Sequence, residues 1–264
     1  MQVRFRLRLL LHIGALLLVI ILVAGVLAWF FALPLEAHYF GRRLPVLRKT
    51  PTSVRDTSFT ESTGRKSTFC GCAFDVPWND LDESRTKTGP SSAILYFNSG
   101  LVVILKCLPP REFVDGVFSS FKVNPAAFRQ AFGDGAVQSD YGLVSLMLET
   151  TPEAMTFRTP QRRQGAIMAM LVLKAMATPP ADSGIFSIHT GEFDGFQYQD
   201  PQAKPKSVLV DLFAQDRGLE FNFFLSYKGA TPQFSQADIN RIVRTVHKVA
   251  PYAPVKQAGL TQAH

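Results

Sequence analysis

The hydrophobic residues form one long apolar run near the N-terminus, and the larger remaining region contains shorter hydrophobic segments with the spacing of strands or helices. Leu9–Leu33 contains no charged residue and is longer than the roughly 20 apolar residues that a helix needs to cross a bilayer. Trp29 suits the membrane interface, and Pro34 marks a natural exit. A cleaved signal peptide is the alternative, but its apolar region is only about 7–15 residues long and ends at a site of small residues. The pattern therefore predicts an uncleaved signal anchor, a single transmembrane helix preceded by a short tail at residues 1–8.

Short β-type runs occupy both halves of the remaining chain. Ala93–Phe97 and Leu101–Cys107 are apolar and are joined by Asn98-Ser99-Gly100, whose glycine can take positive φ, so we predict a β-hairpin there. The strand predicted at Ser207–Ala214 has one mixed face, because Asp211 lies between apolar residues. Further strands are predicted at Thr68–Val76, Gly184–Thr190, Phe193–Gln199 and Leu219–Ser226.

Helical periods fill the middle of the chain and its C-terminal end. Gln161–Ala177 is apolar on most sides, but its uninterrupted apolar stretch is too short for a second span, so we predict a buried core helix. The last helix begins at the capping-box sequence Ser235-Gln236-Ala237-Asp238 and is expected to end at Pro251. Three more helices are predicted at Arg111–Phe121, at Pro125 to about Phe132 with Asn124 as the N-cap, and at Ser139–Glu149.

The order of these elements indicates an α+β fold, because strands are followed by helices, then by a strand meander and a closing helix. We predict a mainly antiparallel sheet covered by helices, which follows the N-terminal transmembrane helix. Residues 34–66 have no strong period and are predicted to be a linker that holds the domain away from the bilayer. The soluble α+β domain is assigned to residues 67–252, and residues 253–264 are predicted to be a disordered tail.

Positive charge is concentrated in the anchor and its flank. The net charge is +7, and the residues up to Lys66 hold ten basic and three acidic side chains, whereas the rest of the chain holds 18 of each. A nucleic-acid reader should carry its basic excess on the folded domain, so this class of function is disfavoured. Because Arg4, Arg6 and Arg8 crowd one end of the span, the positive-inside rule predicts a cytoplasmic N-terminus and an extracytoplasmic domain in the cell envelope. The lipid bilayer is thus a predicted partner, through Leu9–Leu33.

The segment Phe74-Asp75-Val76-Pro77-Trp78 resembles the opening of PsbP-like domains, which pair an aromatic residue, a proline and a tryptophan at the end of a first strand. The hairpin, the late meander and the C-terminal helix are also similar to that α/β/α sandwich, over about residues 68–250. In this chain the tryptophan directly follows the proline, and the helical middle is larger than expected for that family. The resemblance implies a scaffold used largely for binding and assembly, and it assigns no catalytic residue. The chain is also similar to uncharacterised bacterial membrane-anchored proteins.

Three cysteines, Cys70, Cys72 and Cys107, are the most reactive candidates in the chain. An exported domain would allow a disulfide between Cys107 and either Cys70 or Cys72, because such compartments permit oxidation. Three free, partly buried thiols are the alternative. A soft-metal site of three thiolates is a third interpretation, but no fourth ligand with suitable spacing is visible.

The histidines lack the partners that catalysis needs. His189 is followed by Glu192 and Asp194, and His247 lies in the last predicted helix. No metalloprotease, deaminase or nucleophile-elbow motif surrounds either residue. A structural role at the end of a strand is therefore the preferred interpretation of His189.

The acidic residues of one polar segment, Asp80, Asp82 and Glu83, lack the spacing of a calcium-binding loop. They are interpreted as a solvated acidic loop. The glycine pairs of the chain are typical of turns, and none forms a phosphate-binding loop. We therefore expect no cofactor and no metal, and we assign no catalytic residue.

Three functions are consistent with these observations. The anchor, the neutral domain and the lack of a recognisable catalytic set favour a membrane-tethered, non-enzymatic binding or assembly domain of the cell envelope, with an unknown protein partner. One alternative is an envelope hydrolase or thiol enzyme whose site is assembled from distant residues, such as His189 or His247 with Cys107 or a carboxylate in a deep polar cleft. Another is a carrier of a small ligand or lipid, which requires a large apolar cavity under the sheet.

Overall fold

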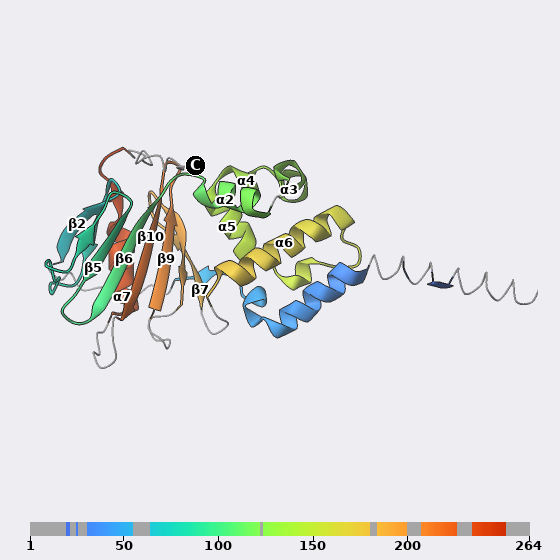
Figure 1. Ribbon diagram of the computed structural model, residues 1–264, viewed down its shortest axis with the longest axis horizontal. Coiled ribbons are helices and arrows are strands. Elements are labelled where there is room, and N and C mark those ends of the chain that lie inside the picture. Colours follow the sequence, from blue (N-terminus) through green and yellow to red (C-terminus); the bar gives the residue numbers. More distant parts are fainter. Residues whose placement is uncertain are drawn as a thin grey trace, which may run out of the picture.

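A central β-sheet separates a helical layer from a smaller layer of three strands and one helix (Figure 1). This computed structural model describes residues 20, 21, 25, 31–54, 64–121, 124–179, 184–199, 207–225 and 234–251. The strands of the central sheet are β1 (Thr52–Ser53), β4 (Lys87–Thr88), β5 (Ser92–Tyr96), β6 (Leu101–Leu108), β7 (Ile185–His189), β8 (Asp194–Tyr198), β9 (Ser207–Phe213) and β10 (Gly218–Leu225).

The eight strands lie in the order β1-β7-β8-β9-β10-β6-β5-β4. Strands β1 and β7 run parallel, and the other neighbouring pairs are antiparallel. The predicted α+β class and the mainly antiparallel sheet are therefore confirmed. The predicted hairpin is also confirmed: β5 pairs with β6, and Gly100 in the turn takes a φ of 88°.

The smaller layer contains the sheet β11-β3-β2, made of β2 (Arg65–Phe69), β3 (Cys72–Val76) and β11 (His247–Lys248). The single strand predicted at Thr68–Val76 is wrong, because the chain reverses at Cys70 and Gly71, which take φ values of 55° and 67°. The apolar pattern continues through the turn, and a cysteine in the left-handed region is not a usual turn signal. The segment that the sequence pattern predicts as one strand is therefore part of a hairpin of two strands, β2 and β3.

The helical layer consists of α2 (Glu112–Phe121), α3 (Pro125–Phe132), α4 (Gly135–Gln138), α5 (Asp140–Glu149), the 3-10 helix η2 (Pro152–Ala154) and α6 (Gln161–Ala177). Asn124 caps α3 by accepting a hydrogen bond from the Ala126 amide at 2.9 Å, as predicted. Ser139 caps α5 in the same way. The predicted bounds of α6 match the structure.

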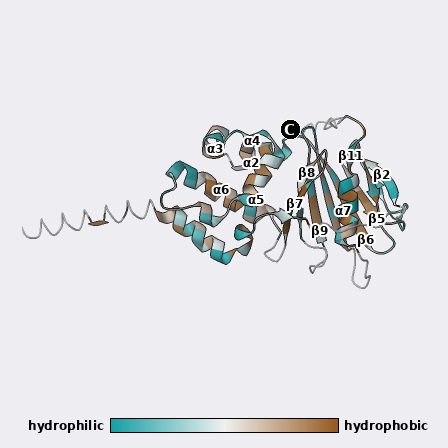
Figure 2. Cartoon of the chain, turned by 180° about the vertical axis from the view of Figure 1, so that it is seen from behind, coloured by the Kyte–Doolittle hydropathy of each residue, from teal (hydrophilic) through white to brown (hydrophobic). Residues whose placement is uncertain are grey.

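Strand alternation divides the hydrophobic residues between the two layers. In β9, Val208 and Val210 are buried in the core shared with the smaller layer. Leu209 and Phe213 of the same strand contact the helices. Strands β6 and β9 are coloured mainly as hydrophobic in Figure 2, because both faces of the central sheet are largely covered there.

The last helix, α7 (Gln236–Thr245), has the predicted capping box. The Ser235 hydroxyl accepts a hydrogen bond from the Asp238 backbone N–H, and the Asp238 carboxylate accepts one from the Ser235 backbone N–H. The prediction that this helix continues to Pro251 is wrong. It ends at Thr245, and the chain then pairs with β3 as β11, so edge pairing replaces the last helical turn.

The structure differs from the linker predicted for residues 34–66. Residues 31–43 are helical, and the 3-10 helix η1 (Pro45–Arg48) follows them. Ala37 and Leu47 are buried against Leu171 of α6. Strand β1 then joins the edge of the central sheet. Leu33, Ala37, Phe40, Leu44 and Leu47 recur at helical spacing, and α6 offers part of this set a buried surface, so the segment packs onto the domain.

Most of the predicted membrane span at Leu9–Leu33 lies outside the described residues, as do the predicted tails at 1–8 and 253–264. Over the part of the chain that the structure describes, no helix combines the length and the apolar character that crossing a bilayer requires.

Candidate functional site

A pocket of about 520 Å³ lies between the central sheet and helices α2, α5 and α6. This volume falls within the roughly 300–1,000 Å³ that is typical of small-molecule sites. Most of its wall is apolar, and the side chains that dominate it are Phe113, Val144, Met147, Leu173, Leu209 and Phe213. The pocket is therefore suited to a ligand with a substantial apolar part.

Two periodicities direct side chains into this pocket. Along β9, alternation places Leu209, Asp211 and Phe213 on the face toward the helices. Along α2, Glu112 and Gly116 are four residues apart and so share the helix face that borders the pocket. Gly116 has no side chain, and a Cβ added there would meet no heavy atom of the described residues within 4 Å, so the space beside it is open.

Four carboxyl groups line the pocket, and two of them have partners. Asp140 accepts a hydrogen bond from the Val114 amide at 2.9 Å and so satisfies the start of α2. Glu220 forms an ion pair with Lys106 at 2.7 Å across neighbouring strands β10 and β6. These two groups therefore have structural roles.

The other two carboxyl groups, on Asp211 and Glu112, make no hydrogen bond or ion pair within the described parts of the chain. Burial and the nearby charge of Glu220 raise the pKa of Asp211 to about 7. Burial, and then the charges of Asp140 and Glu220, also raise the pKa of Glu112. Both carboxyls thus lie in an environment that opposes their negative charge.

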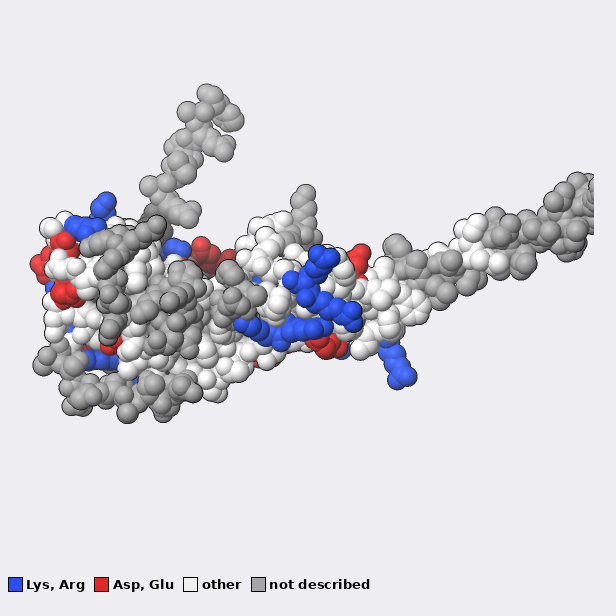
Figure 3. All heavy atoms as spheres, turned by 90° about the horizontal axis from the view of Figure 1, so that it is seen from below, with Lys and Arg blue, Asp and Glu red and all other residues white. Residues whose placement is uncertain are grey.

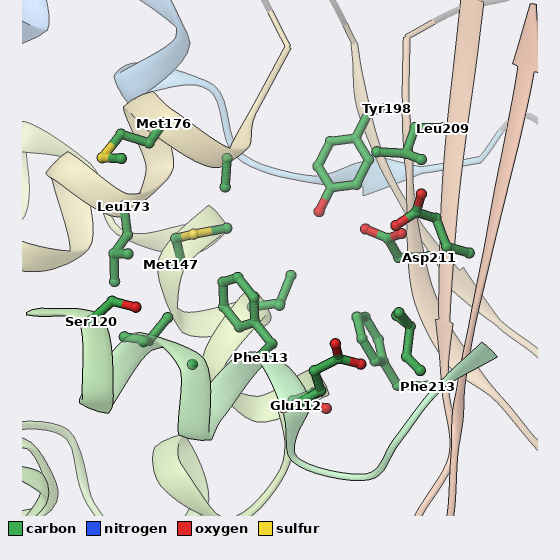
Figure 4. Close-up of a pocket in the computed structure, with 17 residues that line it drawn as sticks. Glu112, Phe113, Ser120, Met147, Leu173, Met176, Tyr198, Leu209, Asp211 and Phe213 are labelled. Atoms are coloured by element: carbon green, nitrogen blue, oxygen red, sulfur yellow. The ribbon is translucent and has the colours of Figure 1, made fainter. Parts of the chain in front are cut away.

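Tyr198 on β8 provides a third unengaged polar group. Its side chain is only 3% exposed, and its hydroxyl has no hydrogen-bond partner among the residues that the structure places. Burial, and then the charge of Asp211, raises its pKa well above the usual value, so it remains a neutral hydroxyl. Figure 4 shows Tyr198, Asp211 and Glu112 pointing into one end of the pocket, while Leu173 and Met147 line the other end. The pocket is therefore amphipathic.

The cysteines lie away from this pocket. Cys70 and Cys107 are joined in a disulfide with a Cα–Cα distance of 5.6 Å, and Cys72 is a buried free thiol. Burial raises the pKa of Cys72, although Arg217 opposes this shift. A buried thiol with a raised pKa is a poor nucleophile. Within the described residues, no group of three histidine, cysteine or acidic side chains could hold a metal ion.

The histidines are exposed and have local partners. His189 Nδ1 lies 2.9 Å from an Asp194 carboxylate oxygen, and the two side chains are 62% and 50% exposed. His247 Nδ1 lies 2.8 Å from the Thr245 carbonyl oxygen. Glu192 accepts a hydrogen bond from the Lys248 amide at 2.7 Å. The structure therefore does not bring either histidine together with Cys107 in a cleft.

The acidic loop has structural contacts of its own. Asp80 accepts a hydrogen bond from the Ser99 amide at 2.7 Å, and Asp82 accepts one from the Ser84 hydroxyl at 2.6 Å. Glu83 pairs with Arg65 at 2.7 Å. These bonds hold the loop against the β5–β6 turn and β2.

The residues at the polar end of the pocket, Asp211, Glu112 and Tyr198, were not identified as a site from the sequence. Asp211 gave the one available signal, since it is the charged residue on the mixed face of its strand. Its association with Glu112, about a hundred residues earlier in the chain, depends on tertiary packing.

A scan against protein-family models and searches of curated proteins and of solved structures found no match to this chain. The resemblance to PsbP-like domains therefore stays a prediction.

Proposed function

We propose that this chain is a membrane-tethered, non-enzymatic binding protein that holds a small amphipathic molecule in the pocket between the sheet and helices α2, α5 and α6. The observation that carries the proposal is the pocket itself, which is apolar along most of its wall and polar at one end. An apolar cavity with a few convergent polar groups is the usual form of a small-molecule site. This function unites the predicted binding domain with the predicted carrier of a small ligand or lipid.

The alternative of an envelope hydrolase or thiol enzyme has less support. His189 pairs with Asp194 on an exposed surface, and Cys107 is held in a disulfide. The remaining thiol, Cys72, is buried. An assembly role with an unknown protein partner stays a prediction.

We further propose that Leu9–Leu33 anchors the protein in the membrane with its domain outside the cytoplasm. The uncharged apolar run and the arginines before it support this topology. The disulfide between Cys70 and Cys107 supports it as well, because disulfides persist in oxidising compartments. An export-dependent reporter fused to the C-terminus should be active, whereas activity of a reporter that folds only in the cytosol would contradict the orientation.

Basic side chains on the helical layer are consistent with a position near lipid headgroups. Figure 3 shows Lys and Arg side chains gathered on this part of the surface. The exposed arginines of this layer and of the preceding segment include Arg42, Arg43, Arg48, Arg158, Arg162 and Arg163. Exposed cations next to a membrane are attracted to anionic lipids.

The binding proposal is tested by filling the pocket. Gly116→Phe should place a ring in the open space beside α2, and Gly165→Phe is the matched control, since it also adds a side chain to open space on a helix but does not line the pocket. The full chain in phosphatidylcholine nanodiscs would be photolabelled with a dodecyl alcohol that carries a diazirine in its chain. Mass spectrometry should locate the label on residues around Met147 and Leu173, and Gly116→Phe should abolish it while Gly165→Phe does not. Labelling that is spread over the surface, or that survives Gly116→Phe, would contradict the proposal.

A further inference from the structure

The pocket that we propose as the binding site has an excess of negative charge. Its lining contains Glu112, Asp140, Asp211 and Glu220, and none of the described lining residues is basic. Lys106 compensates Glu220 from a neighbouring strand, and backbone amides compensate Asp140. The carboxyls of Asp211 and Glu112 form no hydrogen bond or ion pair among the described residues, and the charge of Lys106 offsets their burial only in part.

A tyrosine hydroxyl that has no hydrogen-bond partner among the described residues marks the same end of the pocket. Tyr198 is 3% exposed, lines the pocket and points toward the carboxyls. Its hydroxyl is not among the fully buried polar atoms, so it is accessible from the pocket and free to bond a ligand there. A ligand that donates hydrogen bonds would supply that partner, because both carboxylates and a phenolic oxygen accept them.

These side chains define the chemistry of a ligand that would complement them. Its polar group would donate several hydrogen bonds, carry positive charge and be small enough to fit between the carboxyls and the tyrosine. We infer that the polar end of the pocket binds a primary ammonium group, so the ligand is an amine-bearing amphiphile whose alkyl part lies along Met147 and Leu173. This inference rests on the proposed function and names the ligand class for the same site.

The roles of the three side chains follow from their positions. Asp211, on the floor of the pocket, would form the charge-assisted hydrogen bond. Tyr198 would accept a second bond through its hydroxyl oxygen. Glu112, on the exposed side of α2, would attract the cation at the mouth. The rings of Phe113 and Phe213 also line this pocket, and aromatic faces favour a nearby cation.

The pH dependence of binding is a second property of this arrangement. The titratable and charged groups around Asp211 come from every neighbouring element, namely Glu220 on β10, Tyr198 on β8, Glu112 on α2, Asp140 on α5 and Lys106 on β6. Burial raises the pKa of the Asp211 carboxyl to about 7, and this carboxyl must lose its proton to pair with an ammonium group. Amine affinity should therefore rise between pH 6 and pH 8, whereas the affinity for an uncharged alcohol should not.

The test compares three competitors that share one tail. Dodecylamine, dodecanol and dodecanoate would each compete with the photoreactive dodecyl alcohol on the full chain in phosphatidylcholine nanodiscs. We expect dodecylamine to compete at a concentration about tenfold or more below those of the other two compounds, because only its ammonium group can form a charge-assisted hydrogen bond with a carboxylate. Dodecanol or dodecanoate competing as well as dodecylamine would overturn the inference but leave the proposed function intact. Failure of all three to compete would instead refute the proposed function.

Two variants and a control assign the effect to the site. Asp211→Asn should weaken competition by dodecylamine about tenfold and remove its rise with pH, while leaving dodecanol unchanged. Tyr198→Phe should weaken dodecylamine by a smaller factor. Asp115→Asn, which removes an exposed carboxylate of α2 that does not line the pocket, should have no effect. If Asp211→Asn weakened competition by dodecylamine and by dodecanol equally, the effect would be merely structural and the inference would be overturned. The comparison of competitors on the wild-type protein does not depend on the folding of any variant.

Discussion

Lys174 joins three parts of the helical layer through one fully buried side chain. Its ammonium group donates hydrogen bonds to the carbonyl oxygens of Leu148 at 2.6 Å, Thr150 at 2.9 Å and Leu47 at 3.3 Å. The first two carbonyls belong to the C-terminal end of α5 and the residue after it, where the helix dipole favours a cation. We predict that Lys174→Met destabilises the protein, because three buried carbonyls lose their donor.

The magnitude follows from two opposing contributions. A buried carbonyl without a donor costs about 1–3 kcal/mol, and three carbonyls are affected. Removal of the buried charge acts in the other direction: burial lowers the pKa of Lys174 from 10.5 to about 8, against a smaller opposing effect of Glu153. That shift corresponds to roughly 3 kcal/mol. We therefore expect a net loss of roughly 2–4 kcal/mol in the free energy of unfolding at pH 7.

The same shift gives the wild-type protein a defined pH dependence. Because the pKa of Lys174 is lower in the folded protein than in the unfolded chain, the unfolded chain binds more protons between about pH 8 and pH 10.5, and stability rises with pH there. Below pH 8 the lysine is protonated in both states, and the unfavourable burial of its charge is fully present. Lys174→Met lacks this gain, so the gap between wild type and variant should widen by up to roughly 3 kcal/mol across this window.

Urea unfolding of the full chain in mild detergent, followed by circular dichroism at several pH values, measures both effects. Lys66→Met is a suitable control, because Lys66 is exposed on β2, and it should change the free energy of unfolding by less than about 0.5 kcal/mol. A Lys174→Met protein with wild-type stability at pH 7 and the wild-type pH profile would refute the reasoning.

Three further predictions concern the smaller layer. Cys107→Ser should lower the free energy of unfolding by about 2–4 kcal/mol, because it removes a disulfide that spans 37 residues. Thiol titration of the unfolded, unreduced wild type should find only Cys72, and three free thiols would contradict the pairing. Ser235→Ala should cost about 1 kcal/mol by removing the α7 cap, measured as a shift of the urea midpoint, and an unchanged midpoint would show that the cap contributes nothing. Arg217→Met should lower the free energy of unfolding by roughly 2–4 kcal/mol, because the buried guanidinium donates hydrogen bonds to two backbone carbonyls at 2.8 and 2.9 Å. A variant with the same melting temperature as the wild type would refute this prediction.

Much of the fold could be predicted from local patterns. The bounds of α6 follow from a long helical period, and the α7 capping box follows from Ser235 and Asp238. The hairpin hidden at Cys70-Gly71 could not be predicted, because its turn lacks the usual residues and its two strands share one continuous apolar pattern. The local sequence pattern therefore predicts an element well where the spacing of its apolar residues and its capping residues indicate the same bounds.

The candidate site depends on contacts that no local pattern contains. Asp211 stands out in its strand, but its partners at the polar end, Glu112 and Tyr198, belong to different elements. That these groups have no hydrogen-bond partner among the described residues follows from the tertiary structure and from no local pattern. Catalytic and metal motifs have characteristic spacings in a sequence, whereas this pocket combines single polar residues from separate elements with an apolar wall.

The packing of residues 31–47 on α6 has a mechanical consequence. A flexible linker would let the domain turn freely above the bilayer, but here the helical segment, η1 and Lys174 fix this part of the chain to the domain. Helix α6 also lines the pocket, through Leu173 and Met176. If the predicted span continues into the helix at 31–43, any tilt or rotation of the anchor is transmitted as torque to one wall of the pocket. The thickness and tension of the membrane would then influence how easily the pocket opens, and the release of its contents would depend on the state of the bilayer.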